Sequence, residues 1–187
     1  MYDNNEYIII LILIIILVNS PTDFITNITL RKSVSSQQVK MDLPYFKSEL
    51  LLSFDEIGFK SALIYSHMSW YEMATYTIKD GSKIHLHVGD FVTMQVEDYG
   101  KCYAIIKGIF KHKGNDNKYY AFIVIDWFED INKIHPVLRC PLYRITQNVH
   151  WRRIHPISVI NCVQDVHFIY DITSKLWIKN NYYFTAI

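Results

Sequence analysis

The chain lacks most of the residues that crosslink small proteins or hold structural metals. It contains 3 Cys, 6 Gly and 5 Pro among 187 residues. Cys102, Cys140 and Cys162 form no Cys-x-x-Cys pair, so the sequence does not show the spacing of a structural zinc site. The odd number of Cys also argues against a disulfide framework and favours free, buried thiols in a reducing compartment. Few Gly and Pro argue against low complexity.

An excess of charge of one sign is lacking too. The 19 Lys and Arg and the 18 Asp and Glu leave a net charge of +1. A chain this close to neutral has no overall attraction for nucleic acid or for an anionic membrane. Binding of either kind would need a local basic patch.

Signatures of catalysis are also missing. The sequence has no Gly-x-Ser-x-Gly motif and no phosphate-binding Gly-rich loop. Asp126, Glu129 and Asp130 cluster after a predicted strand, where acidic residues are usually solvated and seldom form a catalytic pair. The 3 Cys and 8 His would allow a nucleophilic pair, but nothing nearby marks a nucleophile. We therefore predict that the chain is not an enzyme and needs no cofactor.

A long apolar run is present near the start of the chain. Residues 7–18 are all apolar, and no Lys or Arg precedes them. The run is shorter than the roughly 20 residues that span a bilayer, and its length is typical of a secretory signal. Three interpretations stay open: a signal peptide or short membrane anchor, an incidental start of the coding region, or a buried element of the fold. If the run is a signal peptide or anchor, Asn27 in Asn27-Ile28-Thr29 would be an acceptor for N-linked glycosylation.

The next segments are less regular. Residues 19–40 are polar and are predicted to be a linker or disordered arm. Residues 42–58 carry apolar side chains at roughly helical spacing, which predicts a short helix. Residues 59–78 are rich in aromatic and strand-favouring residues and are expected to be extended.

From residue 83 onward the pattern is typical of short strands. Ile84, Leu86 and Val88 alternate with polar residues, and the polar segment 111–118 predicts a hairpin loop. Residues 119–128 are apolar on both faces, which indicates a central strand. The predicted strands are 84–88, 91–96, 103–110, 119–128, 142–145, 157–160 and 165–169. The expected fold is mainly β, a small, partly open β-barrel at 83–172. An extension at 41–82 packs on it, and 173–187 form a tail that either packs back or stays irregular.

Two local clusters are candidates for binding. His85 and His87 share one face of a strand, as in some metal sites, but neither Asp90 nor Glu97 has the spacing of the missing carboxylate. A solvent-facing edge is therefore favoured, and no metal site is predicted. Two basic segments could contact phosphates or form an ordinary charged surface. They are Lys111-His112-Lys113 and His150-Trp151-Arg152-Arg153 with His155.

The order of elements from residue 88 to 170 resembles a bromo-adjacent homology (BAH) domain. The motifs that carry the resemblance are Val88-Gly89-Asp90-Phe91-Val92, Tyr103-Ala104-Ile105-Ile106, Ile123-Val124-Ile125-Asp126-Trp127-Phe128, Cys140-Pro141-Leu142-Tyr143 and Ile157–Cys162. They cover a little under half of the chain. Cys140-Pro141 departs from the family, where an acidic residue often stands.

The resemblance implies a non-catalytic interaction module that binds protein partners such as histone tails or nucleosomes, in the nucleus. Some members hold methylated lysine in an aromatic cage by cation–π attraction. Tyr103 and Trp127 match cage positions, and Tyr143 is the third candidate; Trp127 would also suit the core. The alternative is a secreted or membrane-anchored β-domain, with residues 7–18 as the membrane contact and the secretory pathway or membrane as its location.

Overall fold

The structure is a computed structural model. It describes residues 28–35, 45–59, 68–78, 81–96, 99–146, 151–160, 162–163 and 166–182. The apolar run at 7–18, together with Asn27, Glu97 and His150, lies outside the described residues. Among the residues that are described, no helix is long and apolar enough to cross a membrane.

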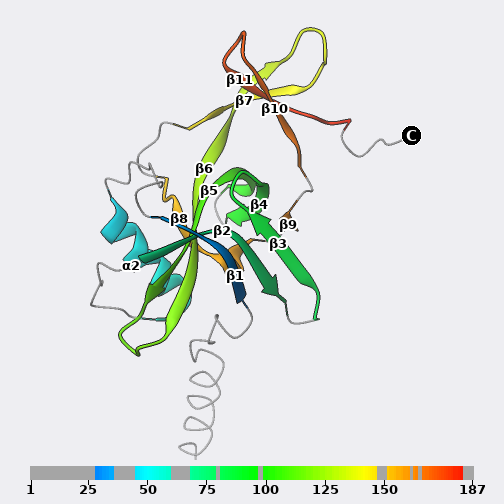
Figure 1. Cartoon of the computed structure of the whole chain (residues 1–187). Helices are drawn as coiled ribbons and strands as arrows, with labels where there is room; N and C mark the ends of the chain where they lie inside the picture. Colours follow the sequence, from blue (N-terminus) through cyan, green and yellow to red (C-terminus); the bar gives the residue numbers. More distant parts are fainter. Residues whose placement is uncertain are drawn as a thin grey trace, which may run out of the picture.

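The described part of the chain is mainly β, as predicted, and its strands form one antiparallel sheet (Figure 1). The main path runs β1-β2-β5-β6-β7-β11-β10, with β3 paired to β2, β4 to β5, β8 to β6, and β9 to β4. Because the path ends at β1 and β10, pairing does not close the sheet. The strands are β1 (Ile28–Val34), β2 (Met68–Thr77), β3 (Lys83–His87), β4 (Phe91–Val96), β5 (Gly100–Lys113), β6 (Tyr119–Ile134), β7 (Pro141–Ile145), β8 (Ile154–Pro156), β9 (Cys162–Val163), β10 (Phe168–Asp171) and β11 (Leu176–Lys179).

Most of the local predictions are confirmed. The helix expected within 42–58 is α2 (Phe46–Glu56), and strands occupy the regions 84–87, 91–96, 103–110, 119–128 and 142–145. The loop expected at 111–118 is shorter than predicted, because β5 continues to Lys113 and Gly114 closes the turn by donating its N–H to the carbonyl of Lys118 at 2.8 Å. The tight hairpin pairs β5 with β6 from Lys113 and Tyr119 at the turn to Ala104 and Trp127.

Two predictions are wrong. Residues 28–34 were assigned to a linker, but they form β1, because its backbone pairs with β2 and Ile28 is buried. A strand needs only every second side chain to be apolar, so polar neighbours can hide it in a sequence. The strand expected at 157–160 lies earlier, at β8, and residues 157–159 form a 3₁₀ turn directly after Pro156. The strand expected at 165–169 exists in part, because β10 starts at Phe168.

The sheet continues on both sides of the range 83–172. β2 pairs with β3 and β5, so it is a strand of the same sheet. In the tail, β11 pairs with β10 and β7, so residues 176–179 pack back onto the sheet. Together with the distal end of β6 they form the upper part of Figure 1.

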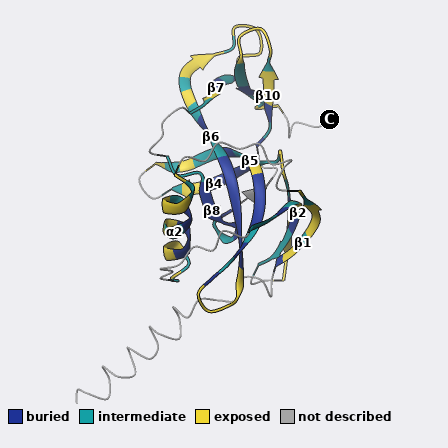
Figure 2. Ribbon diagram, turned by 60° about the vertical axis from the view of Figure 1, so that its left-hand side comes forward, coloured by how far each residue is buried: buried dark blue, intermediate teal, exposed yellow. Residues whose placement is uncertain are grey.

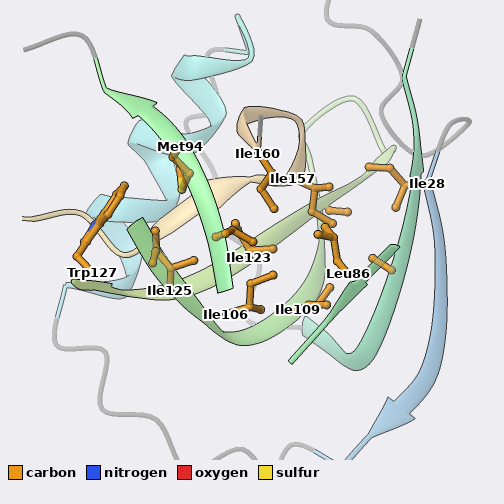
Figure 3. Packing of buried hydrophobic residues seen from close by; sticks show 14 residues of the cluster. Ile28, Leu86, Met94, Ile106, Ile109, Ile123, Ile125, Trp127, Ile157 and Ile160 are labelled. Carbon is orange, nitrogen blue, oxygen red and sulfur yellow. The ribbon is translucent and has the colours of Figure 1, made fainter. Parts of the chain in front are cut away.

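The centre of the fold is β6, which pairs with β5, β7 and β8. Its two apolar faces divide as predicted. Ala121, Ile123, Ile125 and Trp127 belong to a central core (Figure 3), which also contains Leu86, Val92, Met94, Ala104, Ile106, Ile109, Ile157 and Ile160. On the opposite face Tyr120, Phe122 and Val124 pack under α2, while Phe128 belongs to a third cluster at the distal end.

Helix α2 packs on one side of the sheet with its buried residues at positions i, i+3 and i+4, namely Leu50, Ser53 and Phe54 (Figure 2). Phe54 contacts the rings of Tyr120 and Phe122 edge-on, with centroids 5.4 and 4.9 Å apart. This spacing places one helical face in the core and leaves the other in solvent.

Candidate functional site

The three candidate cage residues do not lie together. Tyr103 on β5 and Tyr143 on β7 are neighbours, with ring centroids 6.0 Å apart and planes at 88°. Trp127 on β6 pairs with Ala104, so its side chain lies on the face of the sheet opposite to Tyr103. The cause is a β-bulge between Ile106 and Gly108. If the register of Gly108 with Val124 continued without the bulge, Trp127 would pair with Ile105 and lie on the face of Tyr103.

Trp127 lies in the core. Its side chain is buried, and its indole Nε1 donates a hydrogen bond to the backbone oxygen of Arg152 at 2.7 Å. Its ring packs edge-on against Trp151 and His155, with centroids 5.5 and 5.6 Å away. Of the two interpretations of Trp127, its burial and hydrogen bond support a structural role.

Tyr103 and Tyr143 belong instead to an aromatic cluster at the distal end of the sheet. We use the name distal aromatic cluster for six rings drawn from six strands: Phe91, Tyr103, Phe128, Tyr143, Phe168 and Trp177. Phe168 is its centre, because it stacks on Phe128 with centroids 4.1 Å apart and meets Tyr143 edge-on at 5.2 Å. The only sequence signal for this cluster is the high aromatic content, because the six rings are spread over almost 90 residues and meet only through the pairing of β11 with β7 and β10.

Tyr103 is already in contact with a cation. The Nζ atom of Lys179 on β11 donates to the Tyr103 hydroxyl at 2.7 Å and lies 4.4 Å from the ring centroid. The Nζ of Lys101 lies 5.8 Å from the same centroid. Distances below about 6 Å allow cation–π attraction, so the Tyr103 ring interacts with two lysines of the chain. Sequence reasoning missed Lys179 because it is 76 residues away along the chain.

Tyr143 is fixed as a neutral donor. Burial raises its pKa, and the nearby Asp130 carboxylate, which accepts a hydrogen bond from its hydroxyl, raises the pKa further together with Tyr103. Asp130 pairs with Tyr143 in the β6–β7 register. The phenol therefore stays protonated at neutral pH, and its hydroxyl orients the ring toward Tyr103 and Phe168.

The other acidic residues near the end of β6 are engaged in ion pairs. Asp126 accepts from Arg153 Nη2 at 2.6 Å, and Glu129 accepts two hydrogen bonds from Arg144 at 3.0 and 3.1 Å. The hydrogen bonds from Arg144 lower the pKa of Glu129; desolvation opposes them, and the charge of Arg144 adds to the lowering. Asp126 and Glu129 therefore have structural partners, and neither of these contacts joins two carboxylates as an acid–base pair.

The basic segment near residue 152 forms a clamp between helix α2 and the sheet. Arg152 pairs with Glu56 on α2 and donates to His155 Nδ1 at 2.9 Å. Glu49 on α2 accepts the backbone N–H groups of Arg153 and Ile154, at 2.8 and 3.0 Å. Both arginines are therefore engaged by carboxylates of the chain itself.

Electrostatics within this clamp act on Glu56. Burial alone would raise its pKa, but hydrogen bonds and charges from His155 and Arg152 outweigh burial and hold the pKa below 4.5. The carboxylate is thus ionised wherever the clamp is formed, and it ties α2 to the sheet.

Neighbouring residues of the second basic segment, Lys111-His112-Lys113, lie on opposite faces of the sheet. His112 is fully buried and meets Phe54 edge-on at 5.6 Å, so it does not belong to a basic surface. Lys111 lies on the other face, with Nζ 4.9 Å from the centroid of Tyr119 and 5.7 Å from that of Tyr71. Alternation along β5 separates residues that the sequence places side by side.

The histidine pair lies at an exposed edge. His85 is exposed on β3 and its Nδ1 lies 3.2 Å from Thr75 Oγ1. His87 Nδ1 lies 3.3 Å from Asp90 Oδ2, which also accepts the backbone N–H of His87 at 2.7 Å. Within the described ranges, no three His, Cys, Asp or Glu side chains come close enough to hold a metal ion.

Comparison with models of known protein families gives no match, and comparison with curated proteins gives no similar sequence.

Proposed function

We propose that the chain is a non-catalytic, BAH-like interaction module that binds a cationic side chain of a protein partner. The observation that carries the proposal is the position of Lys179, whose amine is bonded to Tyr103 at the edge of the distal aromatic cluster. A tyrosine that accommodates a lysine of its own chain has the chemistry to accommodate one from a partner. In the BAH-like interpretation this partner is a histone tail or nucleosome, and the location is the nucleus.

The geometry of the Gly-Asp motif supports the same interpretation. Gly89 has a φ of 100°, which only glycine adopts readily, and its N–H donates to the Ile106 carbonyl at 2.8 Å. Ile106 in turn donates to the carbonyl of Asp90 at 2.9 Å. The motif therefore sets the turn from β3 into β4 and aligns it with β5. The strands curl around the central core (Figure 3), as expected if the sheet is a partly open barrel.

The direct test is a titration of the full chain with lysine-containing histone-tail peptides, unmodified and trimethylated, followed by fluorescence anisotropy. Tyr103→Ala is expected to weaken binding about 2- to 30-fold, the equivalent of about 0.5–2 kcal/mol of cation–π attraction. Lys179→Gln removes the internal cation and is expected to strengthen binding.

Tyr119→Ala is the matched control, because Tyr119 also lies beside a lysine, Lys111, but at the opposite end of β6. Equal losses from Tyr103→Ala and Tyr119→Ala, or no peptide binding by the wild-type chain, would contradict the proposal. Nuclear localisation of a C-terminally tagged full chain and of a version lacking residues 7–18, which keeps β1, would support the chromatin role. Secretory localisation of the full chain alone would favour the second candidate, a secreted or membrane-anchored β-domain.

A further inference from the structure

The distal end of the sheet exposes apolar side chains on two hairpin turns. We define the distal lobe as residues 129–145 and 166–182. Its β6–β7 turn carries Val137, 79% exposed, beside Leu138, and its β10–β11 turn carries Ile172, 81% exposed. In Figure 1 both turns lie at the top of the molecule, at the end away from α2, and Figure 2 shows exposed residues there. Large apolar side chains so exposed at turn tips point to an interaction surface.

The two turns lie on neighbouring hairpins. β11 pairs with β7, with Trp177 opposite Tyr143 and Ile178 opposite Leu142. Figures 1 and 2 both show the two turns at the top of the molecule, so their tips can act on one surface.

The net charge of the distal lobe is positive. The lobe contains five Lys or Arg and three Asp or Glu, which leaves a net charge of +2. Glu129 forms an ion pair with Arg144, whereas Asp130 and Asp171 accept hydrogen bonds from uncharged groups and keep their negative charge. By contrast, Lys133, Arg139 and Lys175 form no ion pair with any residue that the structure describes. The local basic patch that the nearly neutral sequence did not reveal is therefore present at the tips.

The backbone of the tips is already hydrogen-bonded internally. His135 Nδ1 accepts the N–H groups of Val137 and Leu138, at 3.3 and 3.1 Å, and the His135 carbonyl accepts Arg139 N–H at 2.9 Å. In the second turn Asp171 accepts from Thr173 at 3.0 Å. Backbone N–H groups without a hydrogen-bond partner are costly in the apolar part of a bilayer. In these turns the N–H groups of Val137, Leu138 and Thr173 already have partners within the chain. A protein partner could supply hydrogen bonds and would not need this arrangement.

We propose that the distal lobe docks onto an anionic lipid surface. Val137, Leu138 and Ile172 insert below the headgroups, while Lys133, Arg139 and Lys175 contact the lipid phosphates and carboxylates. The observations favour this occupant because exposed apolar groups lie at two turn tips and the lobe that carries them has a net positive charge. This inference does not depend on the peptide-binding proposal, since it uses neither Tyr103 nor Lys179.

The test is the partition of the full chain onto vesicles of phosphatidylcholine alone and of phosphatidylcholine with phosphatidylserine, measured by sedimentation over a range of lipid concentrations. The ratio of the two partition coefficients is the readout. The first 30 residues contain no Lys or Arg, so binding through residues 7–18 would raise both coefficients without favouring the anionic lipid. Wild type is expected to prefer the anionic vesicles at least 10-fold in low salt, and high salt should remove the preference.

Two variants separate the contributions. The triple variant Lys133→Gln, Arg139→Gln, Lys175→Gln should lose the preference for anionic lipid, by about five-fold per cation removed. The double variant Val137→Ser, Ile172→Ser should lower partition onto both vesicles about 10-fold. Tyr45→Ser with Leu52→Ser is the matched control, because these side chains are 51% and 54% exposed on the other side of the sheet, on or next to α2.

Circular dichroism melts should be unchanged in all variants, because every substituted side chain is exposed. Equal anionic preference in wild type and the triple variant would overturn the proposal, and so would equal loss in the apolar double variant and its control. Self-association in gel filtration that Val137→Ser, Ile172→Ser abolishes, with no anionic preference on vesicles, would also overturn it and assign the lobe to a second copy of the chain.

Discussion

Replacing Trp127 by Ala should destabilise the fold instead of acting on a ligand. The side chain is 4% exposed and packs in the central core against Trp151 and His155. Removing a buried aromatic ring leaves a cavity that the surrounding sheet can fill only in part, and such substitutions cost about 3–5 kcal/mol. The free energy of unfolding should therefore fall by that amount.

Trp127→Phe separates the loss of the indole hydrogen bond from the loss of ring packing. Phenylalanine keeps most of the ring volume but has no N–H, so the Arg152 carbonyl loses its 2.7 Å hydrogen bond. The carbonyl keeps its contact with His155 Nε2 at 3.0 Å, so the loss is that of one hydrogen bond, about 0.5–1.5 kcal/mol. We expect Trp127→Phe to be destabilised by roughly this smaller amount, between wild type and Trp127→Ala.

Urea unfolding followed by far-ultraviolet circular dichroism measures both values. Tyr99→Ala is the control, because Tyr99 also contacts Trp151, with centroids 5.3 Å apart, but is 65% exposed. Its effect should stay within about 0.5 kcal/mol. If Trp127→Ala unfolded at the urea concentration of wild type while losing affinity for lysine peptides, the assignment of Trp127 to the core would be refuted.

Three further predictions concern the helix clamp and the central strand. Glu49→Ala should lower the free energy of unfolding by about 2–4 kcal/mol, because the N–H groups of Arg153 and Ile154 lose their shared acceptor; Glu49→Gln, which keeps an oxygen, should lose less in the same urea assay. Glu56→Gln should make stability less dependent on pH. Burial raises the pKa of Glu56, but His155 and Arg152 lower it by more, so the pKa in the folded protein is below 4.5. The ionised carboxylate therefore stabilises the fold above pH 4.5, and this stabilisation is lost as the pH falls through the pKa of the folded state. Wild type should thus lose more stability than Glu56→Gln in acid melts, and equal slopes would contradict the assignment. Ile123→Val should cost about 0.5–1.5 kcal/mol in urea unfolding, and a neutral result would contradict the tight packing around β6.

Hydrophobic alternation in the sequence was sufficient to find most strands and to assign faces to β6. Successive side chains of a strand point to opposite faces, so Ile123 and Ile125 could be grouped against Phe122 and Val124 without knowledge of any partner strand. The helix at α2 was found by the same reasoning with a period of 3.6 residues. β1 was missed because its outward residues are mostly polar and its pairing partner, β2, is about 40 residues away.

Candidate site residues were predicted less well, because their relation depends on register between strands. Of the three candidates, Tyr103 and Tyr143 are neighbours in the structure, but Trp127 lies on the opposite face, because of the bulge between Ile106 and Gly108. One extra residue reverses the orientation of every side chain beyond it, and no periodicity in a single strand indicates where it will occur.

The sequence by itself determined that this chain is mainly β, with a central strand buried on both faces, because local alternation and turn chemistry depend only on near neighbours. Tertiary structure alone decided which side chains meet across long separations. It brought Lys179 to Tyr103, tied Glu49 and Glu56 to the segment around Arg153, and left Val137 and Ile172 exposed on the distal lobe. Those contacts depend on how the sheet curls and how its ends pack back, which the whole core determines together.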